Sequence, residues 1–314
     1  MSVYTTIERS TLEQFLRRYD LGALVSFEGI SAGIENTNYF VTTERGEYVL
    51  TIFEELSAEE LPYFLDLMAF LAEHGVPCAH PEADREGRYL QSLMDKPAAL
   101  VRRLAGASVE HPNTVQCAAI GAALAVMHRE GRRFPRRRDN PRGPRWWAET
   151  ARQVLPRLAP EDAELLQEEL RFQRLHKLAD VPRGVIHADL FRDNALFVKD
   201  ALTGIIDFYY ACNDALLYDL AVTVNDWCST ADGSLDAARL TALLEAYRPI
   251  RSFTPMERGA WPVMLRAAAL RFWLSRLKDL HFPKEGEITH TKDPDVFRRI
   301  LCHRIAHHEE LRHV

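Results

Sequence analysis

One stretch, residues 184–209, constrains this chain more than any other, because short apolar runs alternate in it with isolated polar residues. The polar residues that stand out are His187, Asp189 and Asn194 in one loop, and Asp207 after the last apolar run. We interpret the apolar runs as strands, the last two of which form a hairpin, so that Asp207 returns close to Asn194 and Asp189. Two carboxylates and an amide oxygen are the hard oxygen ligands that Mg²⁺ prefers.

The spacing of these residues matches a template for phosphoryl transfer, His-x-Asp-x-x-x-x-Asn followed by an Asp after a further pair of strands. In this template Asp189 accepts the proton of an attacking hydroxyl, and His187 orients the loop. Asn194 and Asp207 hold magnesium on the phosphates of ATP. The alternative is a polar surface loop with an Asx turn. That alternative would leave Asp207 unpaired within an apolar run, where burying the charge is costly.

Composition places the chain among ordinary globular proteins of two domains or lobes, with 314 residues, of which 47% are hydrophobic and 27% charged. The net charge of −6 argues against a general nucleic-acid binder. The five cysteines form no Cys-x-x-Cys pair, which indicates reduced thiols in a cytoplasmic protein and neither a disulfide framework nor a zinc site. We see no secretory leader, and the longest apolar run, 118–127, is too short to span a bilayer, so we expect no membrane association.

Residues 1–104 predict a small sheet with one main packed helix, which would form an N-terminal nucleotide-binding lobe. The strand-like runs are 39–43, 47–53, 88–93 and 98–104. Ser57 and Glu60 have the spacing of a capping box and predict the start of the helix, which would end near His74.

Two segments of this lobe are candidates for contacts with a nucleotide. A loop rich in Gly and Asn precedes the first hairpin and can present backbone N–H groups to phosphates, which makes Gly33, Asn36 and Asn38 candidate ligands. The alternative for this loop is an ordinary surface hairpin. Arg103 and Leu104 lie where a hinge to the next lobe is expected, and their backbone could meet adenine.

Residues 105–314 predict a larger, helical lobe for catalysis and substrate binding. Thr254 and Glu257, with Pro255 between them, predict a strong helix start. The helix should run to about Leu280, and it is apolar on two faces, which is typical of a buried helix.

Arginines raise two further questions in this lobe. Arg266, Arg271 and Arg276 lie on the predicted buried helix, and a buried guanidinium must be paired, either with a structural carboxylate or with an anionic substrate. Residues 129–145 contain eight arginines and three prolines, which favours a solvated loop or a contact for an anionic ligand or partner. We also expect Asp219 to cap the helix after the central motif and to brace the catalytic loop.

Taken together, the motifs resemble the aminoglycoside phosphotransferase and choline kinase-like family, and within it the bacterial homoserine kinases of this fold. The segments that carry the resemblance are 33–40, 48–54, 187–194, 206–208 and 269–276. The resemblance implies an α+β, two-lobed protein kinase-like fold, with a small antiparallel-sheet N-terminal lobe and a larger, mainly helical C-terminal lobe. It implies ATP, Mg²⁺ and phosphoryl transfer to a small-molecule hydroxyl. The homoserine kinase likeness implies conversion of L-homoserine to O-phospho-L-homoserine, on the route to threonine.

The sequence departs from the wider family at one position, and the resemblance also leads to a hypothesis about how the substrate binds. The wider family has a phosphate-binding Lys where Thr51 stands, a departure that homoserine kinases share, and Arg192 is a candidate cation for the transferred phosphoryl group. Homoserine is a zwitterion, so it needs a cation and an acceptor. We expect Arg271 to grip its carboxylate and Asp226, beside Trp227, to accept its ammonium.

Other functions stay open at this point. A choline kinase would need an aromatic cage, for which Trp227, Trp261 and Trp273 are available. An aminoglycoside kinase would need a strongly acidic pocket, and the 15 acidic and 14 basic residues of 205–314 argue against one. A catalytically silent nucleotide-binding protein is favoured by the missing Lys, but the intact Asp and Asn residues of the motif oppose it.

Overall fold

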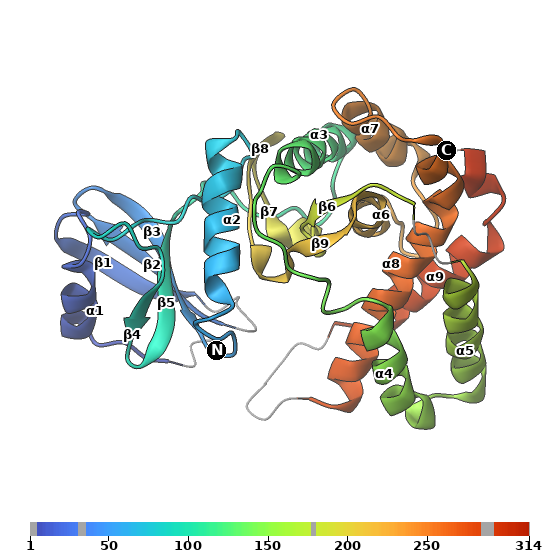
Figure 1. Cartoon of the computed structure of the whole chain (residues 1–314), viewed down its shortest axis with the longest axis horizontal. Coiled ribbons are helices and arrows are strands. Elements are labelled where there is room, and N and C mark those ends of the chain that lie inside the picture. The colour runs from blue at the N-terminus through green and yellow to red at the C-terminus, as the bar shows by residue number, and fades with distance from the viewer. Residues whose placement is uncertain (1–4, 31–35, 177–179, 284–291, 314) are drawn as a thin grey trace. The chain divides into compact units, whose positions relative to one another are not determined.

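The computed structural model of this chain contains two compact units, and each is described by itself (Figure 1). The residues that the structure describes are 5–30, 36–176, 180–283 and 292–313. The first unit comprises Met1–Gly106 and Thr203–Ile206, and the second comprises Ala107–Leu202 and Asp207–Val314. The predicted boundary after Leu104 lies two residues before the first of these divisions, and no sequence pattern predicted that residues 203–206 belong to the first unit.

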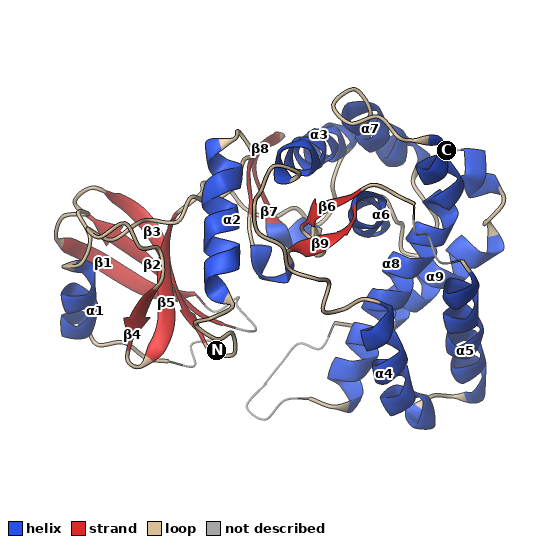
Figure 2. Cartoon of the chain, viewed as in Figure 1, coloured by secondary structure: helices blue, strands red, loops and turns tan. Residues whose placement is uncertain are grey.

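The first unit is an antiparallel sheet with two helices (Figure 2). Its elements are α1 (Arg9–Leu16), β1 (Leu24–Ile30), β2 (Asn36–Thr43), β3 (Gly46–Phe53), α2 (Leu61–Glu73), β4 (Gln91–Leu93) and β5 (Lys96–Arg102). The five strands follow the order β1-β2-β3-β5-β4. Leu12 and Phe15 of α1 join Tyr39, Leu50 and Leu100 of the sheet in one buried apolar cluster. The predicted small sheet is therefore present, with α1 packed on one of its faces.

Helix α2 begins later than its sequence predicted. The backbone N–H groups of Glu60 and Leu61 both donate to the carbonyl of Ser57, at 3.1 and 3.3 Å, so this segment is a turn that precedes the helix. No side chain caps α2, and Pro62 lies in its first turn, where a missing N–H costs nothing. The capping box predicted from Ser57 and Glu60 is therefore wrong.

Residues 203–206 complete the first unit. The N–H of Ile205 donates to the carbonyl of Pro77 at 2.7 Å, and the hydroxyl of Thr203 donates to the carbonyl of Ala105 at 2.5 Å. Gly204 lies under Leu104, and a Cβ atom built on it would come within 2.1 Å of Leu104 Cδ1. A larger residue would require the Leu104 side chain to move, so this strand is closely packed into the unit that it joins.

The second unit is mainly helical (Figure 2). Its elements, with the strand that leads back to the first unit, are α3 (Thr114–Gly131), α4 (Pro144–Val154), η1 (Leu155–Arg157), α5 (Pro160–Leu175), β6 (Arg183–Ile186), η2 (Arg192–Asn194), β7 (Ala195–Val198), β8 (Ala201–Ile205), η3 (Phe208–Tyr210), β9 (Cys212–Ala215), α6 (Leu216–Trp227), α7 (Ala237–Tyr247), α8 (Pro255–His281), α9 (Asp295–Ala306) and η4 (Glu310–His313). Two short two-stranded sheets, β6–β9 and β7–β8, carry the central motif. No helix within the described ranges is both long and apolar enough to cross a membrane.

Helix α8 confirms the prediction from its capping box. The hydroxyl of Thr254 accepts the N–H of Glu257 at 3.2 Å, and the Glu257 carboxylate accepts the N–H of Thr254 at 2.9 Å. The helix continues to His281 and is buried along most of its length, as expected for a helix that is apolar on two faces. It packs against α6 and α9, and two of its arginines, Arg266 and Arg271, are buried in the second unit.

Candidate active site

The catalytic loop leaves the sheet formed by β6 and β9, where Ile186 pairs with Cys212. Ala188 then has a φ of 66°, a left-handed conformation that is uncommon and unfavourable for a residue with a side chain. The ring of His187 is fully buried and lies 4.7 Å from the ring of Phe208, centroid to centroid. His187 therefore packs behind the loop, as expected, and links it to the segment that follows Asp207.

Asp219, on α6, holds this loop through its backbone. Its two carboxylate oxygens accept the N–H groups of His187 at 2.8 Å and of Ala188 at 2.7 Å. Asp219 is fully buried, and the same carboxylate also contacts His128 Nε2 at 3.0 Å. A buried carboxylate is stable only when it is hydrogen-bonded in this way. The structure thus confirms that Asp219 braces the catalytic loop. The expectation that Asp219 caps the helix is wrong, because α6 begins at Leu216 and no side chain caps it.

His128, on α3, extends the brace and was not found from the sequence. Burial lowers the pKa of His128, although the Asp219 carboxylate opposes that shift, so the imidazole is neutral at pH 7. Its Nδ1 lies 2.7 Å from the hydroxyl of Tyr247, which in turn receives a hydrogen bond from Arg251 at 3.0 Å. His128 therefore donates to Asp219 and accepts from Tyr247. A single His on a helix of small residues carries no sequence signal for this role.

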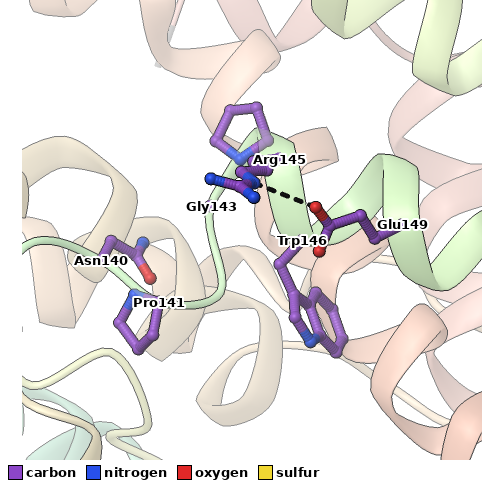
Figure 3. A pocket seen from close by; sticks show the side chains of 7 residues that line it. Asn140, Pro141, Gly143, Arg145, Trp146 and Glu149 are labelled. Atoms are coloured by element: carbon purple, nitrogen blue, oxygen red, sulfur yellow. Dashed lines mark hydrogen bonds and ion pairs between the residues drawn. The ribbon is translucent and has the colours of Figure 1, made fainter.

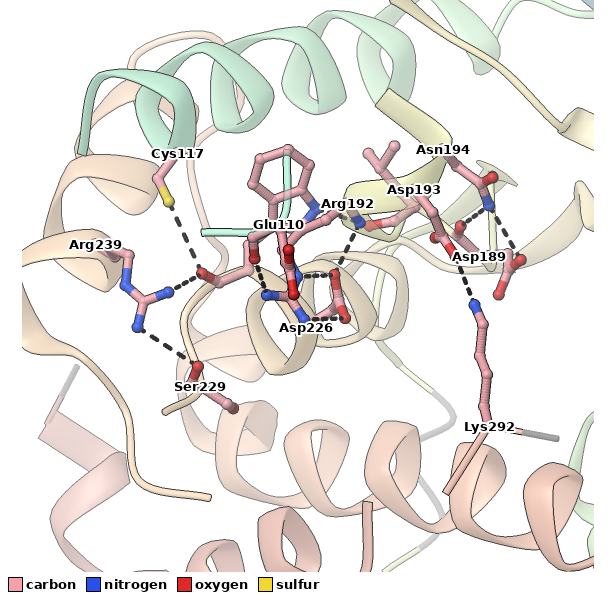
Figure 4. Close-up of polar contacts among 12 residues, drawn as sticks. Glu110, Cys117, Asp189, Arg192, Asp193, Asn194, Asp226, Ser229, Arg239 and Lys292 are labelled. Carbon is pink, nitrogen blue, oxygen red and sulfur yellow. Dashed lines mark hydrogen bonds and ion pairs between the residues drawn. The ribbon is translucent and has the colours of Figure 1, made fainter. Parts of the chain in front are cut away.

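Asp226, Arg192 and Trp227 form a second brace, and this arrangement disagrees with the roles predicted for them. Figure 4 shows the contacts between Asp226 and Arg192. Asp226 accepts the backbone N–H of Arg192 at 2.8 Å and its Nε at 3.1 Å. Another Arg192 nitrogen, Nη1, donates to the carbonyl of Glu110 at 2.5 Å. Trp227 is fully buried, and its indole N–H donates to the carbonyl of Leu190 at 3.1 Å. All three side chains have protein partners. Asp226 is therefore already used and is poorly placed to accept the ammonium of a substrate, and Arg192 is already used and is poorly placed to bind the transferred phosphoryl group.

Asp189 is oriented by Asn194, as Figure 4 shows. The amide Nδ2 of Asn194 donates to the backbone carbonyl of Asp189 at 2.9 Å and to its carboxylate at 3.2 Å. Because the amide nitrogen is used in this way, Asn194 Oδ1 points its lone pairs elsewhere and is suited to a cation. Nearby, Lys292 Nζ lies 2.5 Å from the carboxylate of Asp193. The sequence analysis did not find Lys292.

The electrostatic surroundings of Asp189 suit a general base. Burial raises the pKa of Asp189 from 3.8 to about 7; the cation of Arg271 opposes this shift, and the negative charges of Asp207 and Asp193 reinforce it. A general base is most effective when its pKa lies near the working pH. Asp189 therefore combines a raised pKa with a fixed orientation.

Asp207 adopts the left-handed conformation, with φ 64° and ψ 60°, and this turns its side chain to the surface. The expectation that Asp207 lies buried within an apolar run is wrong for this reason. Its negative charge nevertheless contributes to the raised pKa of Asp189, and its convergence with Asn194 stays a prediction. Within the described residues no cluster of three or more His, Cys, Asp or Glu side chains could hold a metal ion alone. One carboxylate, one amide oxygen and substrate phosphates are a sufficient set for Mg²⁺, and Asp207 and Asn194 fit it.

Asn36 and Asn38 lie on β2 in the first unit, whereas Gly33 lies outside the described residues. Asn38 Oδ1 accepts the hydroxyl of Thr51 at 2.8 Å, and Asn38 Nδ2 donates to the carbonyl of Asn36 at 3.3 Å. The Asn36 side chain receives the N–H of Glu54 at 3.4 Å. Both amides thus shape the β2–β3 hairpin, and their contact with ATP stays a prediction.

Among the described residues of the first unit, no lysine lies on the face of the sheet that carries Thr51, where the wider family has its phosphate-binding Lys. Lys96 pairs with Glu54 at 2.5 Å, and the same carboxylate group of Glu54 accepts the hydroxyl of Thr37. Successive side chains of a strand point to opposite faces, so Thr37 and Glu54 lie on the face opposite Asn38 and Thr51. Lys96 therefore stabilises the sheet and is remote from the position of the family's lysine.

Arg103 and Leu104 follow β5 in the first unit. The N–H of Arg103 donates to the carbonyl of Glu47 at 3.0 Å, and its guanidinium lies 4.0 Å from the ring centre of Phe40. Leu104 covers Gly204. The backbone N–H of Arg103 is thus occupied, and an adenine contact by Leu104 stays a prediction.

The three arginines of α8 have different partners. Arg266 forms a buried ion pair with Glu169, and Arg276 donates to the carbonyl of Asp293 at 2.8 Å. Arg271 is only 4% exposed, yet it makes no hydrogen bond and no ion pair with any described residue. Its guanidinium stacks on the ring of Phe272 at 3.8 Å. Arg266 is structural, and Arg271 is the one of the three that is suited to an anionic ligand.

The side chains that a choline cage would need are not available. Trp227, Trp261 and Trp273 are 0%, 3% and 1% exposed, so all three belong to the core. All five cysteines are free thiols, as predicted.

The arginine-rich segment mixes surface ion pairs with tertiary contacts. Arg129 and Arg133 both bind Glu130, at 2.7 and 3.2 Å. Arg145 pairs with Glu149 at 2.9 Å on the wall of an open pocket of about 320 Å³ (Figure 3). The pocket is lined by Asn140, Pro141, Gly143, Pro144, Arg145, Trp146 and Glu149.

Comparison with known proteins agrees with this geometry. Residues 26–253 match the model of the phosphotransferase enzyme family. A homoserine kinase of Methylobacillus flagellatus is 56% identical over 99% of this chain and 98% of its own length, and one of Burkholderia pseudomallei is 47% identical over 98% and 97%. Among solved structures, an amicoumacin kinase has a TM-score of 0.68 at 17% identity and covers 98% of this chain and 94% of its own. An aminoglycoside phosphotransferase from Alicyclobacillus acidocaldarius has a TM-score of 0.69 at 14% identity, covering 100% and 98%. The chain has the protein kinase-like fold and belongs to the phosphotransferase enzyme family, in its homoserine kinase group.

Proposed function

We propose that this protein transfers the γ-phosphoryl group of ATP to the side-chain hydroxyl of L-homoserine, giving O-phospho-L-homoserine and ADP. The observation that carries the proposal is identity of 47–56% to homoserine kinases over nearly the whole chain. The oriented Asp189, with its pKa raised to about 7, supplies the chemistry that this reaction needs. The product is an intermediate on the route to threonine, and the free thiols are in keeping with a cytoplasmic location.

Asp189 acts as the general base. Its carboxylate accepts the proton of the homoserine hydroxyl as the oxygen forms its bond to the γ-phosphorus, while the bond from that phosphorus to the β-phosphate oxygen breaks. Asn194 keeps the carboxylate in place through its amide nitrogen. Asp219 holds the backbone on which the base stands.

Asn194 Oδ1 and Asp207 would hold Mg²⁺ on the phosphates of ATP. When bound, the magnesium nucleotide supplies the phosphoryl group and neutralises its charge. The side chain of Asp207 is exposed and carries a formal negative charge, so it can reach such an ion. Arg271, buried and without a protein partner among the described residues, would bind the carboxylate of homoserine.

The test is an assay of ADP release with homoserine, choline or kanamycin as acceptor, each with and without Mg²⁺. We expect release only with homoserine and only with the metal. Release with choline above that with homoserine would contradict the substrate assignment and leave the kinase assignment standing. No release with any acceptor would favour the silent nucleotide-binding protein.

A further inference from the structure

Two guanidinium groups of the second unit face the same aromatic ring. Tyr210 lies on η3, three residues after Asp207. The guanidinium carbon of Arg142 lies 5.0 Å from the centre of the Tyr210 ring, and that of Arg271 lies 5.5 Å from it. Arg142 comes from the loop before α4 and Arg271 from α8, so two distant parts of the chain bring like charges to one ring.

Neither cation forms an ion pair with a carboxylate of the described part of the chain. Arg142 donates to the Tyr210 hydroxyl at 3.2 Å and to the Ser275 hydroxyl at 3.5 Å, and both of these acceptors are neutral. Arg271 has no hydrogen-bond partner there at all. On the same helix Arg266 shows the usual arrangement, an ion pair with Glu169. Arg271 is 4% exposed and Arg142 is partly buried, and desolvating a charge that has no ion-pair partner is costly, so two such cations favour a bound anion.

The loop that carries Arg142 is held in place and is not a solvated arm. The backbone N–H of Asn213 donates to the carbonyl of Arg138 at 2.7 Å, and Asn140 Nδ2 donates to Asp214 at 2.7 Å. The N–H of Arg142 itself donates to the Asn140 side chain at 2.8 Å. These contacts tie the loop to β9, so the position of Arg142 is set before any ligand arrives.

We propose that Arg142 and Arg271 together bind the carboxylate of the acceptor, with the Tyr210 ring setting the position of both. This inference rests on the proposed function, since it names the second half of the acceptor site. Planar guanidinium groups are well suited to hold a carboxylate through parallel hydrogen bonds. Phe272 follows Arg271 on α8, and its ring lies 4.4 Å from the ring of Phe191 in the loop of Asp189, so the carboxylate and the reacting hydroxyl belong to one short molecule. The site therefore selects short hydroxy amino acids.

The test compares L-homoserine with L-homoserinamide, in which a neutral amide replaces the carboxylate, in wild type, Arg142→Gln and a matched control. The control is Arg145→Gln, since Arg145 lies three residues away and its side chain is 93% exposed. We expect Arg142→Gln to lower the ratio of kcat/KM for homoserine to kcat/KM for the amide by about tenfold or more, because a lost charged hydrogen bond has an effect of that size. The KM for ATP should stay within about twofold, and Arg145→Gln should leave the ratio unchanged.

An equal loss of kcat/KM for both acceptors in Arg142→Gln would overturn the inference. Arg142 would then only position Tyr210 and would not bind the carboxylate. If thermal melting shows that Arg142→Gln is unfolded, Tyr210→Phe replaces it. That variant keeps the ring but removes the hydroxyl that positions Arg142, and it should lower the same ratio to a smaller extent; an unchanged ratio would again overturn the inference. A wild-type protein that does not phosphorylate homoserine would contradict the proposed function before any variant is compared.

Discussion

Two groups of polar side chains in the second unit differ in where their partners are. The loop brace, formed by His128, Asp219, Asp226 and Trp227, makes its hydrogen bonds inside the protein. The acceptor group, formed by Arg142, Asp189 and Arg271, makes no ion pair with the described residues. Asp occurs in both groups, and an Arg occurs in both once Arg192, the partner of Asp226, is counted with the loop brace. What separates a structural role from a functional one here is whether the protein already satisfies the charge.

If this distinction is correct, changes in the acceptor group reduce activity and spare stability, whereas changes in the loop brace reduce stability. Asp189→Asn should lower kcat by roughly 10²–10⁴-fold, because the general base is lost. The folded-state pKa of Asp189 is about 7, above its unfolded value of 3.8, so ionising this group above pH 3.8 costs stability in the wild type. The variant should therefore melt at the same temperature as the wild type or higher at pH 8. A kcat within a few-fold of the wild type would break the comparison.

Asp219→Ala should show the opposite pattern. The N–H groups of His187 and Ala188 and the ring of His128 would all lose a buried partner, so unfolding free energy should fall by about 3 kcal/mol or more. Chemical denaturation measures this change. Asp193→Ala is the matched control, since Asp193 is exposed on the same loop. Equal stability of the two variants would show that Asp219 is not a brace.

The candidate metal ligands test a third kind of residue, whose side-chain oxygen would bind a cation. Asp207→Asn and Asn194→Ala should each raise the Mg²⁺ concentration for half-maximal rate by about tenfold, because one of few protein oxygens at the ion is lost. Titration of the rate with MgCl₂ at saturating ATP measures this shift. Titrations that superimpose on the wild type would rule out the pair as metal ligands.

Arg271→Lys tests the acceptor group without changing its charge. A Lys offers a point charge in place of a planar fork, so KM for homoserine should rise by roughly tenfold while KM for ATP stays nearly constant. Initial-rate kinetics with each substrate varied in turn separates the two. A similar rise in both KM values would place Arg271 with the structural residues.

The pH profile gives the smallest effect. With a base of pKa about 7, kcat/KM for homoserine should fall as the pH drops below 7, since the protonated carboxyl cannot accept a proton. Arg271 lowers the pKa of Asp189, so Arg271→Gln should move this acid limb to higher pH. Rates measured from pH 5.5 to 9 show the limb, and a shift to lower pH would contradict the predicted coupling.

Local patterns in the sequence predicted part of the site well. The spacing of His187, Asp189 and Asn194 is set within one loop, and the capping box of Thr254 and Glu257 is set within one helical turn. In such cases the residues that interact are close in sequence, so their types and spacing carry the information. The fold class followed from the same logic, since strand runs precede helical runs.

Contacts between distant segments could not be predicted in this way. Asp226 and Trp227 were expected to face a substrate, yet the rotation of α6 turns them towards Arg192 and Leu190. Arg142 is one of eight arginines in its segment, and only the folded loop distinguishes it from its neighbours. Asp207 reaches the surface because its own backbone is left-handed, and the pattern of apolar residues around it does not predict that conformation.

The first unit is discontinuous in the chain, and this has a consequence for synthesis on the ribosome. Gly106 leaves the ribosome before residues 203–206 are made. Within this later segment, Ile205 donates a hydrogen bond to the carbonyl of Pro77, and Gly204 packs against Leu104. At typical bacterial elongation rates of about 5–20 residues per second, the roughly 100 intervening residues take about 5–20 s. The N-terminal unit of the nascent chain must therefore wait, incomplete, until most of the β7–β8 hairpin has been translated.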